Sequence, residues 1–293
     1  MPVQQQTLFT GTPTFSDLSA REILLKAPLP PRTETYTPIA HGQIMAQTES
    51  SLKRLGFQVQ HTQYRAAMNG DLGQAEYHLQ YGTDPEMGLM VAWQNSYNKM
   101  ASFKYAIGAH VFVCANGMVA GDLGAYKRKH TGEADHESVG MIEYYLQDAK
   151  VIFDRLVADR EVLKEKTLNL RKMAELMGRM YVDEQIINST QLNIMKRELE
   201  NPSYHYGVPV CNAWSLYNFA THAFKEDSPR NWLRRHNELH NFFAGEFGLE
   251  VYSAPAMETA VEVVTPTAVI ETPVVQEKII LSATTYDDIM DMF

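Results

Sequence analysis

Residues 102–117 read SFKYAIGAHVFVCANG, and this stretch decides the fold class. Phe103, Tyr105 and Ile107 alternate with smaller or charged residues, which is the period of a β-strand with one buried face. The stretch then stays apolar and ends on Asn116-Gly117, two residue types that tolerate positive φ. The pattern predicts a long strand followed by a tight turn.

Three earlier stretches also have the character of strands. Residues 57–60 and 76–81 alternate between apolar and polar side chains, and residues 88–93 form a short apolar run typical of a strand buried on both faces. Four or five strands that follow one another without intervening helices favour an antiparallel sheet.

Helical patterns flank these strands. A helix is predicted from about Gly42 to Leu55, with a stop at Gly56. Apolar residues recur every seven positions at Ile142, Ala149, Leu156, Leu163, Leu170 and Met177. This heptad spacing predicts one long helix or a helical hairpin over residues 138–181, and three shorter helices are expected within 183–247. The predicted fold is α+β: an antiparallel sheet with long helices packed on one face.

Composition divides the chain into four parts. Residues 1–40 are rich in Thr, Pro and Gln and are predicted to form an extended N-terminal arm, ahead of a globular α+β domain at 41–253. Residues 254–282 are rich in Val, Thr, Pro and Glu, which favours a disordered, flexible linker; one or two extra strands are the alternative. Residues 283–293 form an acidic tip.

The totals describe an ordinary globular protein, with 45% hydrophobic and 21% charged residues. No stretch reads as a signal peptide, and no run of about 18 apolar residues predicts a membrane span. The two cysteines, Cys114 and Cys211, lie in apolar contexts that indicate a reducing compartment. A cytoplasmic location is therefore expected, the host cell cytoplasm if the protein is phage-encoded.

The charge is distributed unevenly. The whole chain carries −9, and residues 254–293 hold seven acidic residues and one basic residue, which leaves −3 for the rest. Residues 96–130 hold five basic residues against the single acid Asp122. An acidic chain of this kind still presents a locally basic face, so a nucleic-acid partner is not excluded.

Motifs for catalysis are missing from the sequence. There is no phosphate-binding loop, no dinucleotide fingerprint and no Gly-x-Ser-x-Gly elbow. His236 and His240 resemble a zinc-peptidase pair, but Asn237 stands where the general base belongs, and both are expected to be exposed histidines. The loop 130–136 also lacks a supporting second cluster of ligands. We therefore expect no enzyme activity, no catalytic residue, no metal and no cofactor.

A binding pattern is present instead, because basic and aromatic residues are interleaved along and after the strands. The predicted nucleic-acid-binding residues are Tyr97, Lys99, Lys104, Tyr105, Lys127, Arg128 and Lys129. Single-strand binders combine cations for phosphates with aromatic rings on which bases stack. The alternative is that the aromatic residues belong to the core and the lysines to a solvated face, and the residues alone do not decide between the two.

The C-terminus alternates acidic and apolar residues and ends on phenylalanine. The predicted partner-binding residues are Asp287, Asp288, Ile289, Asp291 and Phe293. A terminal aromatic ring beside a free carboxylate fits an apolar pocket rimmed by Arg or Lys on another protein. A frayed acidic end without function is the alternative.

This end resembles the acidic tip of bacterial and phage single-stranded DNA-binding proteins, which also follows a disordered linker and ends in Phe. The resemblance covers about ten residues and departs from the pattern in lacking a proline before the last residue. It implies that the tip recruits replication, recombination and repair proteins.

The body resembles a family of phage and plasmid proteins that is known only as a domain of unknown function. The resemblance rests on residues 95–99, 108–116 and 213–221 and extends over about residues 40–250. It implies an origin in a mobile genetic element and brings no established chemistry.

Together these features predict a phage-type single-stranded DNA-binding protein of DNA replication and recombination, with strand annealing as a further activity. Its partners would be single-stranded DNA and the proteins that bind the tip, with no membrane; the heptads fit an intramolecular hairpin or a homo-oligomer equally well. The alternative is an interaction or host-takeover protein that binds no DNA and captures partners of the host single-strand binder.

Overall fold

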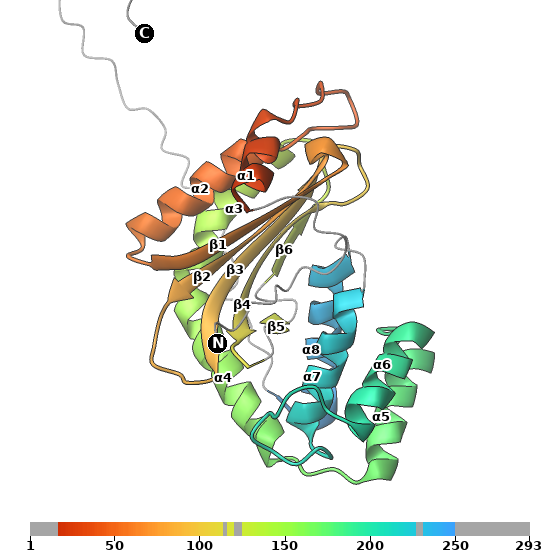
Figure 1. Cartoon of the computed structure of the whole chain (residues 1–293). Coiled ribbons are helices and arrows are strands. Elements are labelled where there is room, and N and C mark those ends of the chain that lie inside the picture. The colour runs from red at the N-terminus through yellow and green to blue at the C-terminus, as the bar shows by residue number, and fades with distance from the viewer. Residues whose placement is uncertain (1–16, 114–115, 120–124, 227–230, 250–293) are drawn as a thin grey trace, which may run out of the picture. The chain divides into compact units, whose positions relative to one another are not determined.

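The computed structural model describes residues 17–113, 116–119, 125–226 and 231–249, which contain one six-stranded antiparallel sheet (Figure 1). Its strands are β1 (Gln58–Ala67), β2 (Leu72–Gln80), β3 (Met87–Ser96), β4 (Phe103–Val111), β5 (Asn116–Val119) and β6 (Ala125–Arg128). Strands β1 to β4 follow one another across the sheet, and β5 and β6 both pair with β4. The predicted α+β class and antiparallel sheet are confirmed.

Eight α-helices accompany the sheet in the described part of the chain. They are α1 (Asp17–Lys26), α2 (His41–Arg54), α3 (Ala134–Gln147), α4 (Ala149–Glu165), α5 (Leu170–Val182), α6 (Ser189–Glu200), α7 (Ala213–Ala223) and α8 (Trp232–Phe247). Helices α3 and α4 pack against β4, while α7 and α8 contact β5 and α5 lies beside α6 (Figure 1). None of the described helices is long and apolar enough to cross a membrane.

The main core lies on the face of the sheet that α2, α3 and α4 cover. Alternate residues of β3 and β4 point into it, among them Trp93, Phe103 and Tyr105, which are fully buried. The opposite face carries a smaller apolar cluster in which Leu233 of α8 joins Met90, Ala92, Ala106 and Val119. Because side chains alternate along a strand, every residue between the core positions belongs to this second face.

The prediction of one long helix or a helical hairpin over residues 138–181 is wrong, because three separate helices occupy this region. Asp148 (φ −91°, ψ 1°) separates α3 from α4, and the side chain of Asn169 accepts a hydrogen bond from the Lys172 N–H to start α5. The break turns Leu170 outward, where it is 63% exposed, whereas Leu163 stays buried. A heptad pattern reports which residues are apolar but not where the helix axis changes direction.

The predicted turn at Asn116-Gly117 is also misplaced. Both residues belong to β5, where they pair with Val111 and His110 of β4. Strand β4 ends at Val111, and the side chains of Phe112 and Val113 that follow are about half exposed. The chain therefore reverses before Asn116, since Asn and Gly permit a turn without requiring one.

The N-terminal arm contains a helix that packs on the sheet. Leu24 of α1 is buried, and a Cβ atom at Gly73 of β2 would lie 2.7 Å from its Cδ2 atom, so glycine is needed for this approach. Further along, Thr37 donates a backbone hydrogen bond of 2.9 Å to His130. The predicted linker and tip lie outside the described residues.

Candidate functional site

The second face of the sheet carries a row of polar side chains that crosses five strands. The strand register places side by side Arg65 (β1), Gln74 (β2), Gln94 (β3), Lys104 (β4) and Lys127 (β6), which we call the polar row. Residues two positions along a strand share its face, so Glu76 and His78 lie on the same face beside the row. The sequence pattern did not reveal this row, because it depends on the register between strands.

The inner part of the polar row is enclosed by the protein. Gln74 and Gln94 are buried, and the Gln74 Nε2 atom lies 3.3 Å from the Gln94 Oε1 atom. Burial lowers the pKa of Arg65 to about 10, although the neighbouring Glu76 acts in the opposite direction. These side chains are therefore packed inside the protein and are not accessible to a large ligand.

The outer end of the row concentrates positive charge. Lys104 is partly buried, Lys127 is exposed, and Arg234 of α8 lies close enough to repel Lys104; we call these three residues the cationic end. Burial, followed by repulsion from Lys127 and Arg234, lowers the pKa of Lys104 to about 8. Glu238 compensates only in part, because its carboxylate is bound by Arg234 at 2.8 and 3.0 Å. An anion at this place would relieve the repulsion.

Three other predicted cations differ in how available they are. Lys99 is exposed, has a positive φ of 62° and places its Nζ atom 4.7 Å from the Tyr36 ring centroid. Lys129 is exposed as well. Arg128 is occupied by an ion pair, with its Nε atom 2.6 Å from a carboxylate oxygen of Glu137.

The two tyrosines predicted to stack on bases are buried. Tyr105 has no exposed surface and belongs to the main core. Tyr97 is 5% exposed; its ring stacks on His41 at 4.0 Å, and its hydroxyl accepts the His41 backbone N–H at 2.9 Å. In this structure neither ring offers a face to a base: Tyr105 points from β4 into the core, as the alternative expected, and Tyr97 follows β3 and packs on His41.

A hydrogen-bond network that includes two buried histidines holds residues 95–99 in place. Asn95 joins His41 to His130: its Nδ2 atom lies 3.1 Å from the His41 Nδ1 atom, and its Oδ1 atom lies 2.7 Å from the His130 Nε2 atom. Burial lowers the pKa of both histidines to about 4. The Ser96 hydroxyl closes the following loop by donating to the Ala101 carbonyl at 2.8 Å. These residues build the loop that presents Lys99.

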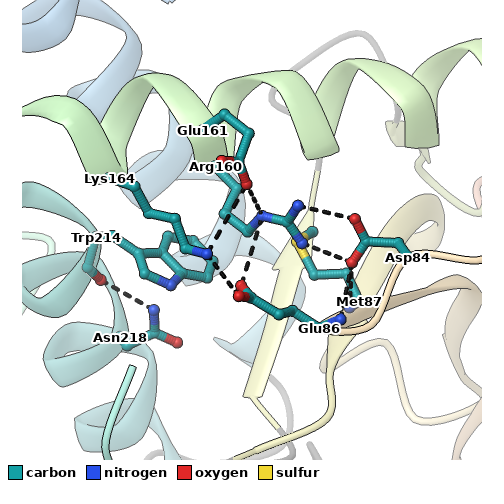
Figure 2. A network of polar contacts seen from close by, with 8 residues as sticks. All are labelled: Asp84, Glu86, Met87, Arg160, Glu161, Lys164, Trp214 and Asn218. Carbon is teal, nitrogen blue, oxygen red and sulfur yellow. Dashed lines mark hydrogen bonds and ion pairs between the residues drawn. The ribbon is translucent and has the colours of Figure 1, made fainter. Parts of the chain in front are cut away.

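A second polar cluster fixes α4 to the loop between β2 and β3 (Figure 2). Arg160 binds both carboxylate oxygens of Asp84, at 2.6 and 2.8 Å, and Lys164 binds Glu86 at 2.6 Å. Although burial alone would raise it, the pKa of Asp84 is lowered by the Arg160 guanidinium and two backbone N–H groups. Every charge drawn there has an opposite partner, so this cluster stabilises the fold and leaves nothing for a ligand.

Histidines also gather on the second face of the sheet, at one side of the polar row; we call this face the polar face. His61, His78 and His110 come from β1, β2 and β4, and Glu76 lies 3.2 Å from the His78 Nε2 atom. Burial raises the pKa of Glu76 against the opposing effect of His78. Burial, followed by the two other histidines, lowers the pKa of His110 to about 3. A polar residue at every second position, as in Glu76-x-His78, is the one sequence signal of this cluster, and a solvated strand face has the same signal.

The other metal candidates remain weak. His236 and His240 are buried, contrary to the prediction that they are exposed, and the His240 Nε2 atom lies 3.5 Å from an Asp159 oxygen. Elsewhere in the described ranges, ligand atoms of Glu133, Asp135 and His136 lie within 4.8 Å of one another. That group is largely exposed, and Arg32 already binds Glu133 at 2.8 Å.

The predicted partner-binding residues Asp287 to Phe293 lie outside the described residues, so the tip remains a prediction. The search of curated proteins found no match, and neither did the search of solved structures. A family of unknown function was predicted over about residues 40–250, and its phage or plasmid origin stays a prediction. Residues 28–241, well over half of the chain, match the family described as Domain of unknown function (DUF932), and the chain belongs to this family.

Proposed function

We propose that this chain is a phage-type single-stranded DNA-binding protein of DNA replication and recombination, with strand annealing as a further activity. DNA phosphates bind at the cationic end and at Lys99 and Lys129, and the tip from Asp287 to Phe293 recruits partner proteins. The supporting observation is the cationic end itself, where Lys127 and Arg234 both repel Lys104 and Glu238 acts against them.

The physical argument rests on charge compensation. Holding like charges together is unfavourable, and this repulsion adds to the larger effect of burial in lowering the pKa of Lys104 to about 8. A phosphate placed among the three cations removes the repulsion and gains charge-assisted hydrogen bonds. Since the buried tyrosines offer no stacking surface, phosphate contacts dominate, and binding is expected to be independent of sequence and steeply dependent on salt.

Fluorescence anisotropy of labelled oligo-dT across a salt series tests the interface. The double variant Lys127→Glu/Lys129→Glu should bind at least about tenfold more weakly, and the slope of log affinity against log salt should fall by about 0.7 for each phosphate that is no longer neutralised. The double variant Lys53→Glu/Lys196→Glu, on α2 and α6, is the matched control, because it changes the net charge by the same amount at exposed positions outside the sheet. Equal weakening in both variants would show only a general effect of net charge and would contradict the proposal.

A truncation at residue 282 tests the division of labour. The shortened chain should bind oligo-dT as well as the full chain or more tightly, because an acidic tip competes with DNA for the cations. Partner recruitment should disappear. If neither chain binds DNA at low salt, the proposal fails and protein capture through the tip becomes the better explanation.

A further inference from the structure

The histidines of the polar face form a cluster that the proposed function does not use. His61, His78 and His110 stand on three strands of one sheet, and Glu76 precedes His78 by two residues on the same face. The register places Gly88 of β3 opposite His110, so β3 contributes no side chain of its own there, and the Phe112 ring lies 3.1 Å from where a Cβ atom at Gly88 would be. The rings therefore meet across the intervening strand.

Two of the three pairs of rings have a spacing that suits a shared metal ion. Ring centroids are 5.5 Å apart for His61 and His78, and 4.3 Å apart for His78 and His110. Imidazoles that bind one tetrahedral Zn²⁺ through bonds of about 2.0–2.1 Å have their centroids roughly 5 Å apart. The two observed distances lie on either side of this value.

Two buried polar atoms in the cluster lack a hydrogen-bond partner. They are the Oε1 atom of Glu76, whose residue has no exposed surface, and the Nδ1 atom of His110, whose residue is 9% exposed. A buried carboxylate without full compensation is unfavourable. A cation held between these atoms would satisfy both.

We propose that His61, His78, His110 and Glu76 form a binding site for Zn²⁺ or a similar late first-row divalent ion. Three imidazoles and one carboxylate are a donor set that these ions favour over Mg²⁺ and Ca²⁺. Binding requires the imidazoles to turn their nitrogen atoms to a common point, because the ligand atoms are spread more widely than those of the exposed Glu133 group. The ion replaces the missing partners of Glu76 and His110 and ties β1, β2 and β4 together.

Metal binding by the full-length chain tests the site without any DNA. After treatment with a chelator and buffer exchange, titration calorimetry with ZnCl2 should show one tight ion per chain. His78→Ala and His110→Ala should each weaken binding at least about tenfold, and His136→Ala, which removes the histidine of the Glu133 group, should not. Co²⁺ should give the strong visible absorption of a four-coordinate complex.

The conservative variant Glu76→Gln distinguishes loss of metal binding from loss of folding. It keeps the size of the side chain, and it should retain the metal-free melting temperature while losing most of the stabilisation that Zn²⁺ gives to the wild type. Absence of Zn²⁺ binding, loss of binding in His136→Ala, or a weakly absorbing Co²⁺ complex would each overturn the proposal. Since DNA is not part of the experiment, its failure leaves the proposed function untouched.

Discussion

Two regions of the molecule hold buried ionisable groups, and they differ in whether every polar atom of these groups has a partner. Around Arg160, each buried charge meets an opposite charge at hydrogen-bond distance, and the ion pairs join α4 to the loop before β3 (Figure 2). On the polar face, Glu76 and His110 are equally enclosed, yet each keeps an atom without a partner.

This difference separates a structural cluster from a candidate binding site. Charges that are already compensated gain nothing from a ligand, whereas an uncompensated buried group is stabilised by any ligand that supplies the missing partner. The same reasoning applies to the cationic end, where Lys104 is surrounded mainly by like charges. The following predictions test whether the two regions differ as described.

The largest effect is expected from Arg160→Ala. It leaves Asp84 and Glu86 without their shared cation in a partly enclosed place, which costs about 3–5 kcal/mol of unfolding free energy. Urea denaturation measures the change. Lys26→Ala, which breaks the exposed Lys26–Glu22 pair on α1, is the comparison and should cost less, because both of its side chains are exposed to water. A loss below about 1 kcal/mol for Arg160→Ala would mean that the cluster is not structural.

Acid should destabilise the protein through His41 and His130. Their folded pKa values of about 4 lie below the usual 6.5, so the unfolded chain takes up protons first as the pH falls. Stability is complete above about pH 6.5 and is lost toward pH 4, by up to about 1.4 kcal/mol per pH unit for each histidine. Urea midpoints across this range measure the loss, and His130→Gln should make it shallower. If the stability of His130→Gln fell with pH as steeply as that of the wild type, His130 would not be one of the groups responsible.

Glu76→Gln should change stability little. Removing a buried carboxylate that lacks one partner is expected to be neutral or stabilising within about 1 kcal/mol, in contrast to the Arg160 cluster. The same urea experiment, in chelator, measures it. A cost of about 3 kcal/mol or more would show that Glu76 is fully paired and that the two regions are alike.

The smallest effect concerns Lys104. Because Lys127 helps to lower its pKa, Lys127→Met should move the pKa of Lys104 upward from about 8 toward the usual 10.5. Nuclear magnetic resonance of labelled lysine side chains follows the titration. Lys53→Met, on α2, should leave the pKa of Lys104 unchanged. A shift of equal size in this variant would show that net charge, and not the cationic end, lowers the pKa of Lys104.

Strand β4 could be predicted from the sequence because it carries aromatic or branched residues at every second position, as Phe103, Tyr105 and Ile107 show. The break between α3 and α4 could not, because Ala149 continues the apolar heptad straight across it. The local period is visible in a sequence, whereas the residue at which a helix is interrupted depends on its tertiary packing.

The candidate site was predictable only in part. Lys104 and Lys127 were identified as basic residues, but the closeness of Lys104 to Arg234 follows from the packing of α8. The polar row and the histidine cluster were missed because a strand with alternating polar residues looks the same whether its polar face meets water or the protein interior. Only the register between strands brings Glu76, His78 and His110 into one place.

Strand β1 lies at the end of the sheet order, and its register shifts between Val59 and His61. The residues at this irregularity, Gln58 to Gln60, are exposed. A bulge twists an outer strand and interrupts the regular line of amide groups on which another chain would align. The irregularity therefore makes this edge a poorer template for the strand-by-strand growth that leads to fibrils.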